Sequence, residues 1–303
     1  MVTAEQAAQT LAAVVRELVP DLSWSKARDL VGSGRVRVDG RSETDPARRL
    51  RAGERIEIGG LSAARREPDL IVHLDAEVAV LRKPAGLMTV PFEKEDRDTL
   101  LSRARVAIRR LEASRGQSHN PGLRAVQRLD KDTSGLVVFA RTIPAQRHLQ
   151  RQFTEHTALR RYLAVVHGEA RAGIYESILV PDRGDGLRGS WGVYRQARGN
   201  PPAEARQAIT HVTVEERLRR ATLVSCRLET GRTHQIRIHL AEAGHPLVGE
   251  TVYIRDFSGP WLSAPRLMLH ATELGFEHPR TGKEVRFVEP PPEDFVTVMD
   301  RLR

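Results

Sequence analysis

Residues 128–140 read Arg-Leu-Asp-Lys-Asp-Thr-Ser-Gly-Leu-Val-Val-Phe-Ala, a polar octet that runs directly into an apolar stretch. The apolar stretch has the composition of a buried strand, and the Thr, Ser and Gly before it are typical of tight turns. We therefore predict a polar turn that holds Asp130 at the mouth of a core strand. A fixed carboxylate beside Arg128 and Lys131 is a candidate nucleophile, although the octet alone fits an ordinary surface turn equally well.

The octet also matches the start of a calcium-binding loop, because Asp130, Asp132 and Ser134 have the spacing of its first ligands. The twelfth position of such a loop needs a bidentate Glu, and here it is Arg141. The segment that follows is also strand-like instead of helical. A calcium site is therefore excluded.

Three further segments accompany the octet. Residues 83–87 read Lys-Pro-Ala-Gly-Leu, residues 161–168 read Arg-Tyr-Leu-Ala-Val-Val-His-Gly, and residues 230–239 read Thr-Gly-Arg-Thr-His-Gln-Ile-Arg-Ile-His. With Leu-His-Ala at 269–271 and His-Pro-Arg-Thr-Gly at 278–282, they resemble the RluA/RluD-type pseudouridine synthases, RNA enzymes that isomerise uridine. The resemblance covers nearly the whole chain and is specific because the motifs occur together and in order.

One position departs from that family, which usually has His where this chain has Gln127. The change keeps a polar side chain next to Arg128 and leaves Asp130 untouched. It therefore affects local hydrogen bonding and not the carboxylate itself.

The resemblance implies an α+β pseudouridine synthase fold with a mixed, mainly antiparallel sheet and a central cleft. The irregular mixture of strand-like and helical patterns after residue 69 agrees with an α+β domain. The implied reaction breaks the bond between uracil and ribose and rejoins the sugar to carbon five of the same base. It needs no outside atom, electron or energy source, so no cofactor and no metal are expected. It does need an ionised carboxylate near the ribose, for which Asp130 is the candidate, either attacking the anomeric carbon or removing the neighbouring sugar proton.

Residues 233–243 have the pattern of a helix that ends at Gly244, with three apolar residues on its buried side: Ile236, Leu240 and Ala243. His234 and Arg237 are three positions apart and share a face. Pattern alone makes Arg237 a surface cation, whereas the resemblance makes it the counter-ion of Asp130. Arg232, on the turn before this helix, is expected to contact phosphate.

Tyr162 alternates with Ala164 and Val166, so the pattern alone indicates a core aromatic residue. In the family the matching Tyr lies against the target uracil, where a ring that stacks on an extruded base contributes about 1–3 kcal/mol. Arg128 is expected to fill the space left by the flipped nucleotide or to grip its phosphate. Lys83 is a candidate for the cleft lining, although a solvated Lys before Pro is the ordinary interpretation.

Composition favours an RNA partner. The chain of 303 residues carries a formal net charge of +9 and has a sequence pI near 10.3.

Cys226 cannot form an intramolecular disulfide and is predicted to lie in a core strand. The N-terminus has no basic stretch before an apolar one, and no long apolar run occurs. We therefore expect a cytoplasmic monomer that does not associate with membranes.

The N-terminal part of the chain has its own pattern. Residues 3–19 have apolar side chains at helical spacing and end before Pro20: Ala7, Leu11, Val14, Val15 and Leu18. A second helix is predicted over 25–31, followed by strands over 35–40 and 55–58. Two helices that lead into a small basic hairpin resemble the S-four type RNA-binding domain, a small α/β unit.

Basic side chains in this part would supply phosphate contacts: Lys26, Arg28, Arg35, Arg37, Arg41, Arg48, Arg49 and Arg51. A solvated charged face explains such residues one by one, but poorly explains so dense a cluster. We predict an RNA-binding domain over 1–60, a linker over 61–68 and the catalytic domain over 69–303. Residues 181–202, rich in Gly, Pro and Arg, are expected to form a long loop near the substrate.

Two competing hypotheses remain. A zinc enzyme is disfavoured because His234 and His239 are five positions apart, about 140° around a helix, and do not share a face. A non-catalytic RNA-binding or ribosome-assembly factor would have the same charge and domain order. The joint presence of Asp130, Tyr162 and Arg237 argues against that factor. The motifs do not say which RNA is modified, and ribosomal RNA is favoured over transfer RNA.

Overall fold

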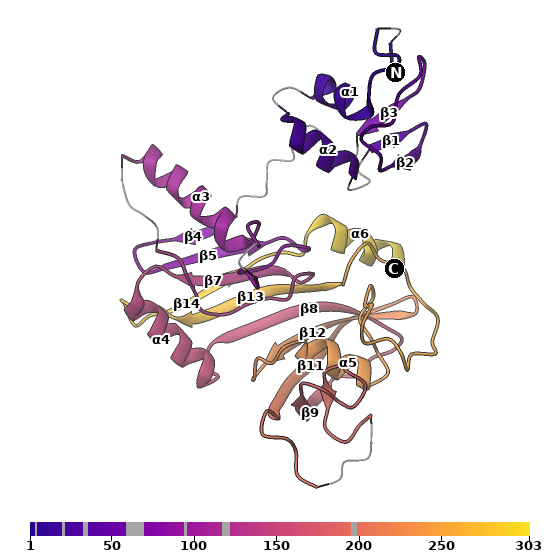
Figure 1. Cartoon of the computed structure of the whole chain (residues 1–303). Helices are drawn as coiled ribbons and strands as arrows, with labels where there is room; N and C mark the ends of the chain where they lie inside the picture. Colours follow the sequence, from indigo (N-terminus) through magenta and orange to yellow (C-terminus); the bar gives the residue numbers. More distant parts are fainter. Residues whose placement is uncertain are drawn as a thin grey trace. The chain divides into compact units, whose positions relative to one another are not determined.

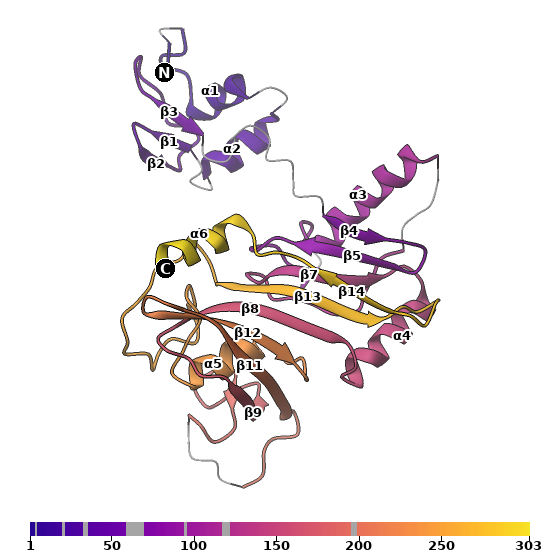
Figure 2. The same cartoon turned by 180° about the vertical axis from the view of Figure 1, so that it is seen from behind.

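The computed structural model describes residues 1–3, 5–19, 22–32, 36–58, 70–93, 96–116, 122–194 and 199–303. The chain divides into two compact units, Met1–Pro68 and Asp69–Arg303, drawn from opposite sides in Figure 1 and Figure 2. The predicted linker over 61–68 lies outside the described residues and stays a prediction. Within the described part of the chain, no helix is both long enough and apolar enough to cross a membrane.

The first unit consists of two helices and a three-stranded antiparallel sheet of order β2-β1-β3. The elements are α1 (Leu11–Leu18), α2 (Trp24–Gly32), β1 (Val36–Val38), β2 (Arg41–Glu43) and β3 (Ile56–Ile58). Strands β1 and β2 are joined by Asp39 and Gly40, whose φ angles of 49° and 76° are those of a tight two-residue hairpin turn. Apolar residues of both helices and of β1 form one core.

The first predicted helix starts later than expected. It begins at Leu11, where the hydroxyl of Thr10 accepts the Ala13 N–H at 3.3 Å and caps the helix. Ala8 has a φ of 67°, which no helix residue can adopt, so the preceding segment forms turns instead. Leu18, predicted on the apolar face, is 52% exposed. The strand β2 was not predicted.

The basic side chains predicted to bind RNA differ in their surroundings. Lys26, Arg28 and Arg37 are exposed, as a phosphate contact requires. Arg48 instead pairs with two carboxylates of its own unit, at 3.2 Å and 3.0 Å, so its charge is already compensated. Arg35 lies outside the described residues.

The second unit is built on one mixed sheet of order β10-β9-β11-β12-β8-β13-β7-β5-β4, with β14 paired to β13 and β6 paired to β7. All of these strand pairs are antiparallel except β13 with β7. The α+β class with a mixed, mainly antiparallel sheet is therefore confirmed. The elements are β4 (Ile71–Leu74), β5 (Val78–Lys83), α3 (Leu100–Ser114), β6 (Arg124–Ala125), β7 (Ser134–Ala140), α4 (Ile143–Thr154), β8 (Leu159–His167), β9 (Gly173–Val180), β10 (Gly189–Ser190), β11 (Arg206–Leu218), β12 (Ala221–Leu228), α5 (Gln235–Glu242), β13 (Leu269–Glu277), β14 (Glu284–Val288) and α6 (Glu293–Leu302).

The strand predicted after the polar octet is β7, and every one of its residues is buried. Val137 and Phe139 pack with residues of α3, while Leu136 and Val138 pack with residues of α4 on the other face of the sheet. Burial on both faces explains why the sequence of β7 is continuously apolar. Cys226 lies in β12 and is fully buried, as predicted.

Gly135 allows β7 and β13 to meet. Its φ is 118°, and a Cβ at this position would lie 2.2 Å from the Ala271 carbonyl oxygen. Any other residue would therefore push the two strands apart. In the strand order of the sheet, this pair connects one half, β10-β9-β11-β12-β8-β13, to the other half, β7-β5-β4. The glycine of the octet thus brings the turn before β7 next to the other half of the sheet.

Candidate active site

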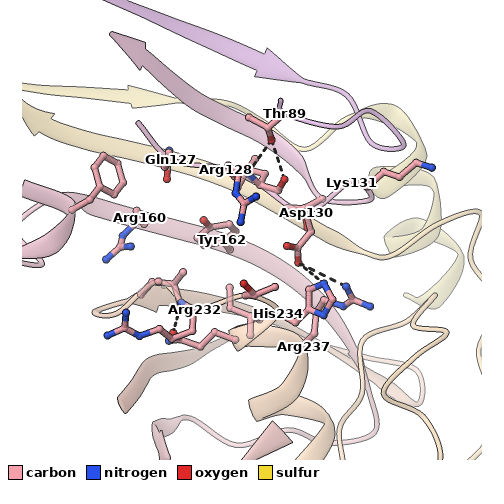
Figure 3. A pocket seen from close by; sticks show the side chains of 18 of the residues that line it. Thr89, Gln127, Arg128, Asp130, Lys131, Arg160, Tyr162, Arg232, His234 and Arg237 are labelled. Carbon is pink, nitrogen blue, oxygen red and sulfur yellow. Dashed lines mark hydrogen bonds and ion pairs between the residues drawn. The ribbon is translucent and has the colours of Figure 1, made fainter. Parts of the chain in front are cut away.

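Residues of four of the sequence motifs, 128–135, 161–168, 230–239 and 269–271, line one cleft of about 940 Å³ (Figure 3). Its walls come from the turn over 126–133, from the segment 88–92, from β8 and from the start of α5. The predicted central cleft is therefore present in the second unit.

Two clamps hold the turn that carries Asp130. The Thr89 hydroxyl donates to the Leu129 carbonyl at 2.9 Å and accepts the Leu129 N–H at 3.1 Å. On the other side of Asp130, the Lys83 ammonium donates to the Lys131 carbonyl at 2.8 Å. Because the peptide groups on both sides of Asp130 are fixed, its carboxylate is held in place before any ligand binds.

Lys83 does not line the cleft, so its predicted contact with RNA is wrong. It is 0% exposed, and its ammonium also donates to the carbonyls of Pro84 and Leu87, at 3.0 Å and 2.6 Å. Burial lowers the pKa of Lys83 to about 7, and the charges of Asp132 and Asp130 oppose this shift. Since three carbonyls match the three donors of an ammonium group, we assign the charged form at neutral pH.

Arg237 faces Asp130, as predicted, but its closest carboxylate is a different one. Its Nη1 lies 3.8 Å from Asp130 Oδ2, whereas its Nε and Nη2 donate to Glu250 at 2.8 Å and 2.7 Å. Glu250 is fully buried and also accepts backbone N–H groups of the residues that follow it. Arg237 is therefore oriented by Glu250 and presents its remaining nitrogen to Asp130 (Figure 3).

His234 is the second group that faces Asp130. It precedes α5 with a left-handed φ of 60°, and its Nε2 lies 3.9 Å from Asp130 Oδ2. Its Nδ1 lies 2.7 Å from the hydroxyl of Tyr253. Burial lowers the pKa of His234 and raises the pKa of Tyr253 to about 12, so both groups are uncharged at neutral pH. Because the Asp130 carboxylate favours an N–H on the nitrogen that faces it, we assign the imidazole proton to Nε2, and the tyrosine hydroxyl then donates to Nδ1.

The predicted helix over 233–243 is shorter than expected, because α5 spans Gln235–Glu242. Ile236 and Leu240 are buried as predicted, but Ala243 is exposed.

Tyr162 is a core residue that also reaches the cleft. It is 8% exposed and belongs to the core cluster around β7, yet it also lines the cleft. Burial raises the pKa of Tyr162 to about 12, so its phenol keeps its proton.

The cleft is strongly cationic. Arg128 is exposed in it, and Arg232 lines it while donating through Nε to the Gln207 carbonyl at 3.0 Å. Among the described residues that line the cleft, Asp130 is the one acidic side chain, against six cations: Arg128, Lys131, Arg160, Arg188, Arg232 and Arg237. Such a surface suits a polyanion.

Sequence reasoning missed Glu250, Tyr253, Arg160 and Arg188. Arg188 lies in the predicted loop over 181–202, which also contains β10. Glu250, Tyr253 and Arg160 belong to none of the sequence motifs, and the partners that place them at the site lie 13 or more positions away in the chain. His239, part of the zinc hypothesis, hydrogen-bonds to two hydroxyls, those of Thr210 at 2.9 Å and Ser177 at 3.0 Å, while His234 faces Asp130.

Comparison with known proteins identifies the family. The model of the RNA pseudouridylate synthases matches residues 77–242. The chain belongs to the RNA pseudouridylate synthase family. It is thus an isomerase that acts on RNA, and residues 9–56 match the S4 domain, so the predicted resemblance is confirmed for both parts.

The relatives span nearly the whole chain. Ribosomal large subunit pseudouridine synthase D of Zymomonas mobilis is 34% identical over 99% of this chain and 96% of its own length. An uncharacterized RNA pseudouridine synthase of Bacillus subtilis is 35% identical over 93% of this chain and 90% of its own. The solved human RNA pseudouridylate synthase domain containing 4 has the same fold, with a TM-score of 0.60 at 22% identity, over 77% of this chain and 92% of that chain.

Proposed function

We propose that this pseudouridine synthase modifies uridine in large-subunit ribosomal RNA and that Asp130 is its catalytic carboxylate. The observation that carries the proposal is the position of Asp130, clamped on both sides and facing Arg237 and His234 in a cationic cleft. Support for the substrate comes from relatives named ribosomal large subunit pseudouridine synthase D, which are 32–34% identical over most of both chains.

The reaction balances within one nucleotide. The bond from the ribose carbon C1′ to uracil N1 breaks, a bond from C1′ to C5 forms, C5 loses a proton and N1 gains one. A carboxylate at the position of Asp130 has two routes: it bonds to C1′ and is later displaced, or it removes a proton from C2′ and returns it when C1′ bonds to C5. Both routes need it ionised, and Arg237 supplies the favourable charge 3.8 Å away.

Tyr162 is assigned to the uracil. Its ring lines the cleft from β8, and stacking on a flipped base contributes about 1–3 kcal/mol, which offsets part of the unstacking cost. Its protonated phenol can donate a hydrogen bond to the detached base. Arg128, exposed in the cleft, either replaces the flipped nucleotide or holds its phosphate.

The first unit is assigned to RNA affinity. Lys26, Arg28 and Arg37 are exposed on it and would contact phosphates without reading sequence.

The test is to map pseudouridine in total RNA from cells with and without the gene, and to complement the deletion with wild type or Asp130→Asn. We expect one or more ribosomal sites to lose the modification in the deletion and to regain it with wild type only. The Asn variant should bind RNA within a few-fold of wild type, because it preserves the shape of the side chain.

Two outcomes contradict parts of the proposal. Loss of modification confined to transfer RNA would change the substrate. Full restoration by Asp130→Asn, with deamidation excluded by mass spectrometry, would remove Asp130 from the mechanism and favour an assembly role.

A further inference from the structure

Arg160 is a buried cation with few partners. It lies on β8 two positions before Tyr162, so both side chains are on one face of the strand, about 6–7 Å apart along it. Its exposed fraction is 5%. Among the described residues its one hydrogen-bond acceptor is the Glu229 carbonyl, 2.7 Å from Nη2, and its Nε has none.

The guanidinium of Arg160 is nevertheless rigidly held. Its Cζ lies 5.4 Å from the centre of the Phe153 ring, which fixes the plane of the guanidinium. A Cβ on Gly231 would lie 2.4 Å from Nη1, so the glycine makes room for the guanidinium. With the Glu229 carbonyl, these contacts hold the group on three sides.

The charge of Arg160 is not balanced within the cleft. Asp130 is the single carboxylate among the described lining residues, and Arg237 and His234 already face it. In the view of Figure 3, Tyr162 lies between Arg160 and Asp130, and Arg232 lies below Arg160. Burial lowers the pKa of Arg160, and the charge of Arg232 adds to this effect. A desolvated cation beside a second cation is costly unless an anion joins them.

We propose that Arg160 and Arg232 form a subsite for the phosphodiester of a nucleotide that flanks the target uridine. The planar fork of arginine suits a phosphate, and the anion would lower the repulsion between the two guanidinium groups. Because phosphate contacts position a nucleic acid without reading its bases, the subsite sets the register of the RNA relative to Asp130. The inference rests on the proposed function and adds a binding site to it.

The test combines a protein change with a substrate change. The quantity measured is kcat/KM on short RNA substrates. In these substrates each phosphate near the target uridine is replaced, one at a time, by an uncharged methylphosphonate. Wild type should lose about tenfold or more at one flanking linkage, as expected for a hydrogen bond between charged groups. Arg160→Gln should lose a similar factor on unmodified RNA and should no longer be sensitive to that linkage.

Two controls separate binding from folding. Arg147→Gln removes an exposed cation of α4 that does not line the cleft, and it should keep the full sensitivity. Thermal unfolding of Arg160→Gln should occur no lower than in wild type, since the change removes an uncompensated buried charge. The same measurements are made on Arg232→Gln, which changes a half-buried residue and should also lose the sensitivity to that linkage. They decide the test if Arg160→Gln does not fold.

The outcomes are distinct. If the neutral linkage lowers the activity of Arg160→Gln by the same factor as that of wild type, the subsite is overturned. It is also overturned if wild type is equally active on every neutral linkage. A wild type that forms no pseudouridine on any RNA overturns the proposed function, and the subsite with it.

Discussion

The pair of Arg237 and Glu250 predicts a large and specific effect on stability. Glu250→Gln keeps the shape of the side chain and an acceptor oxygen but removes the charge that faces Arg237 at 2.7–2.8 Å. Glu250 is fully buried and the side chain of Arg237 is 9% exposed, so solvent cannot compensate. Removing one partner of a buried pair costs about 3–5 kcal/mol, and we expect about 3 kcal/mol because Asp130 still faces Arg237. For a unit of this size, the melting temperature should fall by roughly 6–12 °C.

A double-mutant cycle isolates the interaction. Arg237→Met alone leaves Glu250 buried without its cation and should cost a similar amount. In the double variant neither charge remains. Its loss of unfolding free energy should therefore be smaller, by about 2 kcal/mol or more, than the sum of the losses of the two single variants. The control is Asp98→Asn, which breaks an exposed bidentate pair with Arg103 and should cost about 1 kcal/mol or less. Chemical denaturation of all variants provides the free energies.

The pH dependence gives a second measurement on the same variants. Burial alone would raise the pKa of Glu250, but the hydrogen bonds and charge of Arg237 hold it below its ordinary value of 4.5. The unfolded chain therefore binds this proton first as pH falls, so the stability from Glu250 is complete above 4.5 and is lost on acidification. Glu250→Gln should lack this part of the acid destabilisation. Losses that add in the double variant, with an unchanged acid dependence, would refute the assignment of Glu250 as the partner that orients Arg237.

Three further predictions follow from the site and from the first unit. Lys83→Met should lower both stability and kcat, because it removes the clamp on the Asp130 turn, while RNA affinity measured by filter binding stays within a few-fold of wild type. A loss of affinity without a loss of stability would instead make Lys83 an RNA contact. Tyr253→Phe removes the donor to neutral His234, so the pKa of His234, followed by NMR titration, should rise; an unchanged pKa would show that Tyr253 does not donate to this imidazole. Deleting residues 1–60 should weaken binding to structured RNA and reduce the slope of log K against log salt concentration by roughly 0.7–0.9 per lost phosphate contact. Equal slopes for the full-length and truncated proteins would mean that the basic side chains of the first unit form only a solvated surface.

The features that the sequence by itself determined are local or compositional. The octet predicted a turn that leads into a buried strand, because turn-forming residues next to an apolar run leave few other conformations. The combination of motifs predicted the family, which the comparisons confirm. The net charge indicated a polyanionic partner, and the cleft is indeed cationic.

Only the tertiary structure decided which side chains meet. Glu250 reaches Arg237 from 13 positions away, and no local pattern marks a single carboxylate as the partner of a given arginine. Lys83 was expected to be solvated because it precedes Pro, but three carbonyls from two different turns surround it. Whether a charge is hydrated or buried depends on which acceptors the fold assembles. Here the pairing of β5 with β7, in which Lys83 lies opposite Gly135, brings the two turns together.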